Sequence, residues 1–222
     1  MRYFVSVFGL LLFFQIFFQS KLYATTVVEV LAVEYPPFTT SKVESNGVSF
    51  RLLKQRLEAV DQFQIKPLFL PPARLQQKIK QGDWCLSFYP APVTDKTRFL
   101  ALAEQQFKIG LYHKLNDPLI NWTQLEELKG YRVALLRSDR SSQLYQRFIK
   151  SGLKPIFVDE ISQGLRMLQM GRVEVALGDE HLKSYVWVEL NNLEGIAFAE
   201  TALFQTQIGV FVNQDCPIAQ LM

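Results

Sequence analysis

Short apolar runs alternate with segments of helical periodicity along most of the chain. Residues 27–33, 65–70 and 84–89 are apolar runs of strand length, which is typical of strands buried in an α/β sheet. Between them, residues 48–60 repeat apolar side chains on one helical face, and Pro71-Pro72 is predicted to open a second helix, because proline fits a first helical turn. This order of elements predicts a parallel sheet with helices on both faces.

A further apolar run at residues 107–113 is followed by a polar break at residues 114–118, after which the same alternation restarts. A short helix is predicted to open with Thr123 and Glu126 as a capping box and to stop at Gly130. The elements predicted after it are strands at 132–136, 155–158, 173–177 and 207–212 and helices at 142–150, 161–170 and from 217 onward. Two successive α/β units without sequence repetition predict two lobes, and a cleft between lobes is a natural ligand site.

The first 24 residues have the pattern of a cleaved secretory signal peptide. Arg2 gives a positive start, residues 4–18 are almost wholly apolar, and Ala24 offers a small residue for cleavage. The alternative is an uncleaved membrane anchor, but the apolar run of about 15 residues is shorter than the roughly 20 that a spanning helix needs. We therefore expect the mature protein in the periplasm.

Charge and composition exclude one class of partner. Cleavage removes two of the 24 basic residues, so that the rest nearly balance the 21 acidic ones. A balanced chain without a basic stripe gives no electrostatic reason to bind nucleic acid. The 49% apolar composition is ample for a core.

Two cysteines, Cys85 and Cys216, lie far apart in the chain. An oxidising compartment would permit a disulfide between them, but Cys85 lies in an apolar strand and is predicted to be a buried free thiol. His113 and His181 are the only histidines and do not have the spacing of metal ligands. We expect neither a metal nor a cofactor.

Polar residues follow two of the predicted strands in the second unit. Ligands of α/β sheets sit beyond the carboxyl ends of the strands, so these polar residues are expected to share one rim. They are Ser138, Asp139, Arg140, Ser141 and Asp179. The alternative is helix capping, by Asp139 and Ser141 for the helix at 142–150 and by Asp179 for a helix at 180–188.

Five short motifs, in their order and spacing, resemble a known family. They are Tyr35-Pro36-Pro37-Phe38, Gly82-Asp83-Trp84-Cys85-Leu86, Thr94 to Arg98, Leu128-Lys129-Gly130-Tyr131-Arg132-Val133 and Gly171 to Asp179. Together they are similar to the extracytoplasmic solute-binding proteins of family 3, the type that serves polar amino-acid importers. The resemblance covers nearly all of the chain after the signal segment.

The resemblance implies a two-lobed α/β fold of the periplasmic-binding-protein type II, with two crossover strands between the lobes. The implied boundaries are 25–108 for lobe 1, 109–113 for a hinge, 114–203 for lobe 2 and 204–222 for the second crossover and return to lobe 1. Closure is expected to bend the chain near 106–111 and 204–209. The family's terminal helix is reduced here to 217–222, so apolar surface on lobe 1 is expected to stay exposed.

The resemblance also implies roles for residues of the cleft. Arg98 matches the arginine that holds a ligand carboxylate, and Asp179 the aspartate that holds its amine. The other candidates are Tyr35 or Phe38 as the aromatic wall, Ser138 to Ser141 as anion-binding groups, and Arg74, Tyr89 and Thr94 along the rim. Arg74 is added because a cation is disfavoured at a helix start unless it faces another partner.

This chain departs from the family after the third strand, where Tyr89, Pro90 and Pro92 replace small hydroxyl residues and Arg98 lies one residue further from Thr94. These differences leave the ligand open. The expected function is binding of a small polar solute by a monomer that delivers it to an ABC-importer membrane subunit, without enzymatic activity. The alternatives are a dehydratase that uses Glu34 or Asp179 as general acid, or a sensing module without a transporter.

Overall fold

The computed structural model describes residues 26–58, 62–117, 121–182 and 193–222. The expected signal segment at 1–24 lies outside the described residues, and so does most of the helix expected at 180–188. Among the described residues, no helix combines the length and the apolar character needed to cross a membrane.

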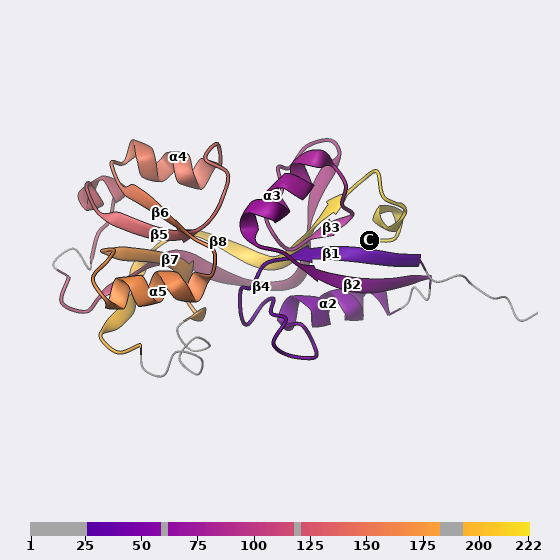
Figure 1. The fold of residues 1–222 in the computed structure, drawn as a ribbon, viewed down its shortest axis with the longest axis horizontal. Coiled ribbons are helices and arrows are strands. Elements are labelled where there is room, and N and C mark those ends of the chain that lie inside the picture. The colour runs from indigo at the N-terminus through magenta and orange to yellow at the C-terminus, as the bar shows by residue number, and fades with distance from the viewer. Residues whose placement is uncertain (1–25, 59–61, 118–120, 183–192) are drawn as a thin grey trace, which may run out of the picture.

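The chain forms two lobes that lie end to end (Figure 1). The elements of the first lobe are β1 (Thr26–Ala32), α2 (Val48–Leu57), β2 (Phe63–Phe69), α3 (Pro72–Gln81), β3 (Leu86–Ser87) and the 3-10 helix η2 (Pro217–Leu221). Those of the second lobe are η1 (Leu125–Leu128), β5 (Arg132–Leu136), α4 (Gln143–Lys150), β6 (Lys154–Val158), α5 (Ile161–Gln169) and β7 (Val175–Asp179). The two-unit organisation predicted from the alternating pattern is thus present.

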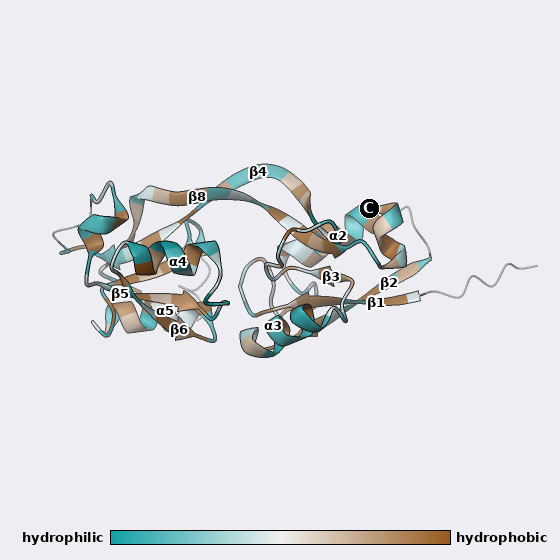
Figure 2. Ribbon diagram, turned by 90° about the horizontal axis from the view of Figure 1, so that it is seen from above, coloured by the Kyte–Doolittle hydropathy of each residue, from teal (hydrophilic) through white to brown (hydrophobic). Residues whose placement is uncertain are grey.

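Two long strands, β4 (Thr97–Lys114) and β8 (Ile196–Asn213), run through both lobes. Figure 2 shows them arching together from one lobe to the other. The strands form one eight-stranded sheet in the order β2-β1-β3-β8-β4-β7-β5-β6. Pairing is parallel within each lobe, as predicted, but antiparallel between β4 and β8 and where these strands meet β3 and β7.

The pattern of apolar residues predicted only parts of these two strands, at 107–113 and 207–212. The strands extend further because each leaves one core, crosses an exposed span and enters the other core. In β4 this span includes the exposed residues Glu104, Gln105 and Gln106, which hide the continuity of the strand from a search for apolar runs.

The pairing of β4 with β8 is irregular between the lobes. Ala101 pairs with Gly209 and Gln106 pairs with Gln207, so β4 carries several extra residues there. Bending at such a bulge disturbs few ladder hydrogen bonds. Residues 109–113 instead pair with β7, and all of them except Leu111 also pair with β8, so the hinge at that position stays a prediction.

Most helix ends follow the predicted chemistry. α3 begins at Pro72 and ends at Gly82, whose φ of 79° is the left-handed conformation that glycine adopts easily. The predicted capping box of η1 is wrong by one residue, since it is formed by Gln124 and Glu127. The carboxylate of Glu127 also accepts hydrogen bonds from the amide and hydroxyl of Thr123, the residue before the N-cap Gln124. Thr123 therefore takes part in the same cap.

The expectation of a free thiol at Cys85 is wrong, because Cys85 and Cys216 form a disulfide with their Cα atoms 5.6 Å apart. The bond joins the residue before β3 to the residue before η2. Beside it, the backbone N–H of Asn213 donates to the Cys85 carbonyl at 2.9 Å. An apolar strand is compatible with either state, and only the tertiary fold brings the partner sulfur close.

The η2 segment covers part of the first-lobe core. Ile218 is fully buried and Ala219 nearly so, in a cluster with Phe50, Leu86 and Val212. In this part of the lobe, the apolar surface that was expected to stay exposed is therefore covered by the short C-terminal segment itself.

Candidate functional site

The two lobes touch through polar contacts that join α3 and Tyr89, two residues beyond β3, to the loop that follows β5. The Tyr89 hydroxyl donates to the Arg137 carbonyl at 2.7 Å, and Gln76 Nε2 donates to the same oxygen at 3.2 Å. Lys80 forms an ion pair with Asp139 at 2.5 Å. The described conformation is thus one in which the lobes are closed on each other.

Asp179, the last residue of β7, is fully buried. One oxygen, Oδ1, accepts a hydrogen bond from the His181 amide at 2.9 Å. The other, Oδ2, is buried and has no donor at hydrogen-bond distance and angle among the described residues. Burial raises the pKa of Asp179, and the His181 amide and the Tyr35 hydroxyl oppose that rise. A buried acceptor without a donor is costly and calls for a partner.

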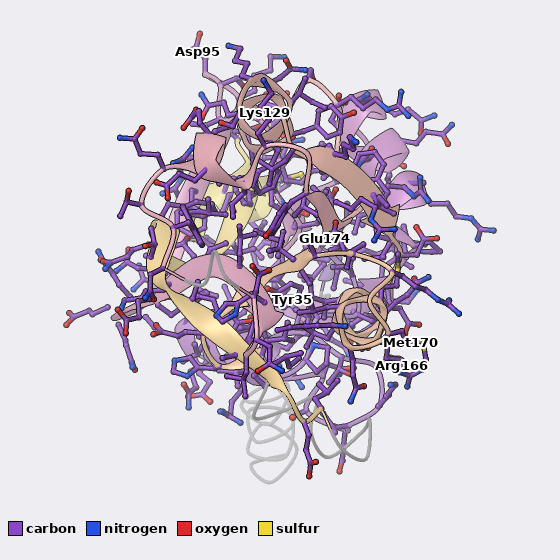
Figure 3. All side chains as sticks on the ribbon, turned by 90° about the vertical axis from the view of Figure 1, so that its left-hand side faces the viewer. Tyr35, Asp95, Lys129, Arg166, Met170 and Glu174 are labelled. Carbon is purple, nitrogen blue, oxygen red and sulfur yellow. A yellow bond between two sulfur atoms is a disulfide. The ribbon has the colours of Figure 1, made fainter. Side chains whose placement is uncertain are left out.

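Tyr35 comes from the turn after β1 and lies next to Asp179 across the two lobes. Burial, and then the negative charge of Asp179, raise the pKa of the Tyr35 phenol well above its usual value. Tyr35 and Leu136, at the end of β5, both pack against the buried clusters of the first and second lobes. In Figure 3, a view along the long axis from the second-lobe side, Tyr35 lies near the middle of the molecule whereas Asp95 projects at its edge.

A row of aromatic rings continues from Tyr35. The Tyr35 and Phe38 rings are 5.9 Å apart, and Phe38 stacks on Phe107 of β4 at 5.0 Å. Side chains alternate between the faces of a strand, so Phe107 lies on the same face of β4 as Ile109, the residue paired with Asp179. Tyr35, Phe38, Phe107 and Asp179 are hereafter called the Asp179 cluster.

The start of α2 holds the turn that carries Tyr35 and Phe38. The amides of Val48 and Ser49 lack partners within the helix, and they donate to the carbonyls of Pro37 and Phe38 at 3.0 and 2.9 Å. Gly47 makes this close approach possible. Its φ is 97°, and a Cβ there would lie 2.4 Å from the Phe38 carbonyl oxygen.

We expect Gly47→Ala to lower the free energy of unfolding by about 1–3 kcal/mol, because alanine is strained at this φ and would push the turn off the helix. Thermal unfolding measures the loss. Gly82→Ala is the matched comparison, since that φ is also positive but a Cβ would meet nothing within 4 Å. Equal losses in the two variants would show that the clash with Phe38 is unimportant.

The polar residues of the loop after β5 differ in burial and in hydrogen-bond partners. The Ser138 hydroxyl is buried without a hydrogen-bond partner among the described residues. Asp139 accepts from the amide and hydroxyl of Ser141; Lys80 first, and then Ser141, hold the pKa of Asp139 well below its usual range. Ser142, not Ser141, caps α4, and Arg140 is exposed.

The contacts of Arg98 differ from the predicted ones. Its guanidinium donates to the carbonyl of Ala219 at 3.2 Å and to that of Met222, at the C-terminal segment. Arg98 stands at the start of β4, opposite Val212, whereas Asp179 is level with Ile109 near the other end of that strand. Thr94 is exposed and accepts from the Lys96 amide within its own turn.

The predicted site residues therefore separate into two groups. Those at the contact between the lobes are Tyr35, Phe38, Tyr89, Ser138, Asp139 and Asp179, and those elsewhere or exposed are Arg74, Thr94, Arg98, Arg140 and Ser141. Sequence reasoning missed Gln76, Lys80 and Phe107. Gln76 and Lys80 are four residues apart, so they are neighbours on one face of α3. That spacing is the signal in the sequence that could have grouped them.

Asp179 is not reachable in the closed conformation. A surface groove of about 620 Å³ lies between η1 and α4, but no member of the Asp179 cluster lines it. Because Asp179 is fully buried, a ligand reaches it only when the lobes separate.

No protein-family model matches the chain, and no curated protein matches it in sequence. Solved structures do match. The fold is that of the two-lobed periplasmic binding proteins. One match is a histidine kinase sensor domain with similarity to periplasmic binding proteins, at a TM-score of 0.70 and 17% identity over 90% of this chain and 86% of that one.

Two further matches are ligand-bound proteins. An ancestral arginine-binding protein bound to arginine has a TM-score of 0.67 and 18% identity, over 88% of this chain and 87% of that one. The GluR0 ligand-binding core from Nostoc punctiforme, in complex with L-glutamate, has a TM-score of 0.66 and 15% identity over 88% of each chain. At such identities the likeness concerns the fold alone, and function depends on the residues of the site.

Proposed function

We propose that this protein binds a small polar solute between its lobes and that Asp179 holds a positively charged group of that solute. The observation that carries the proposal is the fully buried Asp179 carboxylate, whose Oδ2 accepts no hydrogen bond of ordinary distance and angle among the described residues, although the Tyr35 hydroxyl lies beside the carboxylate. An ammonium or guanidinium group would supply that donor as a charge-assisted hydrogen bond.

The buried position of Asp179 also suggests how binding would be coupled to closure. A buried charge whose hydrogen bonding is incomplete is unfavourable, so closing the lobes over Asp179 has a cost that a ligand cation would reduce. A solute that contacts Asp179 only when Tyr35 lies beside it binds the closed form better than the open one. It therefore shifts the population toward the closed form.

The broader biological role is part of the same proposal. A cleaved signal segment at 1–24 would place a monomeric binding protein in the periplasm, where its closed form would be read by an ABC-importer membrane subunit. A sensing role is the second candidate, because one of the matched folds is a histidine kinase sensor domain. Both roles need the same ligand-binding step.

A dehydratase is not favoured, because it would need a second acid beside Asp179. Glu34, the alternative acid, has its Oε1 bound to the amide and hydroxyl of Ser41 at 2.9 and 2.5 Å, whereas its Oε2 is buried without a partner among the described residues. Glu34 is not among the groups that shift the pKa of Asp179, so the two acids do not act as a pair. We therefore propose binding without catalysis.

A thermal-shift screen of residues 25–222 tests the proposal, with amino acids, amines, carboxylates and sugars as ligands. A solute present at 100 times its Kd should stabilise the protein by about 2.7 kcal/mol, which is a rise of several degrees in Tm. Asp179→Ala should abolish the shift. Asp215→Ala is the matched control, because Asp215 is an exposed carboxylate that pairs with Lys96. A full shift in Asp179→Ala would contradict the proposal.

A further inference from the structure

We infer that the ligand of this site is an organic cation without a carboxylate group, such as a diamine or a guanidino amine. The inference rests on the proposed function and adds the chemical class of the solute. It follows from the groups that surround Asp179: they can receive a cation, and the described cationic side chains at the lobe contact are directed elsewhere.

Arg98, the residue expected to hold a ligand carboxylate, is engaged at the C-terminal segment. Its guanidinium donates to the carbonyls of Ala219 and Met222. Freeing it would cost these hydrogen bonds, which tie β4 to the segment that covers the first-lobe core. Arg98 is therefore a structural residue in this chain.

The helix α3 supplies no carboxylate partner either. Its face toward the second lobe is defined by Gln76, which bonds the Arg137 carbonyl, and by Lys80, which pairs with Asp139. Arg74 precedes Gln76 by two residues, so at about 100° per residue it points about 160° away from Gln76. Arg74 is accordingly exposed.

Two cations of the second lobe are also directed elsewhere. The Arg137 guanidinium donates to Asp159 at 2.8 Å and lies over the Phe157 ring at 5.6 Å. Lys108 is level with Glu180, one residue beyond the Ile109–Asp179 pair. Because side chains alternate along a strand, Lys108 lies on the face of β4 opposite to the Asp179 cluster.

What remains around the site suits a cation with an apolar body. Asp179 offers a carboxylate oxygen, and Tyr35, Phe38 and Phe107 offer adjoining aromatic rings. Ring faces attract ammonium and guanidinium groups. The Ser138 hydroxyl, two residues beyond the end of β5, is also buried without a partner among the described residues. The charge of His181 acts on Asp179, but the His181 side chain is exposed, so an added ligand carboxylate would lie near Asp179 without a buried compensating cation among the described residues.

Matched ligand pairs that differ only by the carboxylate test the inference. Isothermal titration of residues 25–222 compares cadaverine with lysine, putrescine with ornithine, and agmatine with arginine. We expect at least one amine to bind about tenfold or more tightly than its amino acid. Amino acids that bind as tightly as the amines would overturn this inference and leave the proposed function standing. Failure of every solute in the screen would overturn the proposed function as well.

A second measurement tests the aromatic part of the site. Phe107→Leu keeps an apolar side chain but removes the ring, and should weaken amine binding about twofold to thirtyfold. Phe99→Leu is the matched control, since Phe99 lies on the same strand but packs on Phe211 outside the Asp179 cluster. Equal amine affinity of Phe107→Leu and the unaltered protein would overturn the role of the rings.

Discussion

Replacing both cysteines, as Cys85→Ser with Cys216→Ser, is expected to lower the free energy of unfolding by about 2–5 kcal/mol. The disulfide spans 131 residues of sequence, and closing a long loop removes much conformational freedom from the unfolded chain. In the folded protein it also anchors η2, which buries Ile218 in the first-lobe core. Urea unfolding of the double variant, compared with the oxidised protein, measures the loss.

Reduction gives an independent control for this expectation. Treating the unaltered protein with a reductant should reproduce the loss of stability, whereas the double variant should not respond to reductant. Unfolding midpoints that are the same in all four samples would mean that the disulfide contributes nothing to stability. A loss in the double variant alone would point to poor packing of the two serines instead.

Replacing Asp179 by Asn is expected to have opposite effects on stability and on binding. Asparagine keeps an oxygen for the His181 amide but carries no charge, so the cost of a buried carboxylate without a second partner disappears. We expect the unliganded variant to gain about 1–3 kcal/mol at pH 7, or about 2–4 °C in Tm per kcal/mol. Amine binding should be lost, because the ligand cation has no counter-charge.

The gain from Asp179→Asn should depend on pH in a defined direction. The pKa of Asp179 is raised in the folded protein by burial, so the folded state holds this proton more tightly than the unfolded chain does. The favourable contribution of protonated Asp179 is fully present below the unfolded pKa of about 3.9, and it is lost as pH rises through the folded pKa. The two proteins should therefore differ little in acid and most at neutral pH.

Thermal unfolding of both proteins from pH 4 to pH 8, without ligand, measures this difference. Asp159→Asn is a suitable comparison, because Asp159 is an exposed second-lobe carboxylate paired with Arg137. A variant Asp179→Asn that is less stable than the unaltered protein at pH 7 would show that the carboxylate is satisfied in the unliganded protein.

Local elements could be predicted where one face of a segment is apolar and its ends carry turn chemistry. The strand predicted at 132–136 is β5 as observed, and the helix predicted from 142 is α4 with Ser142 as its cap. The bounds of β4 could not be predicted, because its central span is exposed and polar between two buried ends. A local apolar pattern reveals a strand only where one face stays buried, and the burial of β4 changes along its length.

The candidate site was predictable in part for the same reason. Asp179 is the last residue of β7, and Tyr35, Phe38, Tyr89 and Ser138 lie within a few residues after the ends of β1, β3 and β5. The strand ends of parallel sheets meet at a common edge. Phe107 was hidden in the middle of a long strand, and Gln76 and Lys80 in a helix. Their role depends on how the second lobe lies against the first, which no local pattern records.

By itself, the sequence determined the alternation of strands and helices, the two α/β units and the polar strand ends, because these follow from periodicity and turn chemistry within a few residues. Only the tertiary structure decided that Cys85 meets Cys216, that Arg98 serves the C-terminal segment and that Tyr35 reaches Asp179. Each of these contacts joins residues that are far apart in the chain, and their meeting depends on the register of the central strands.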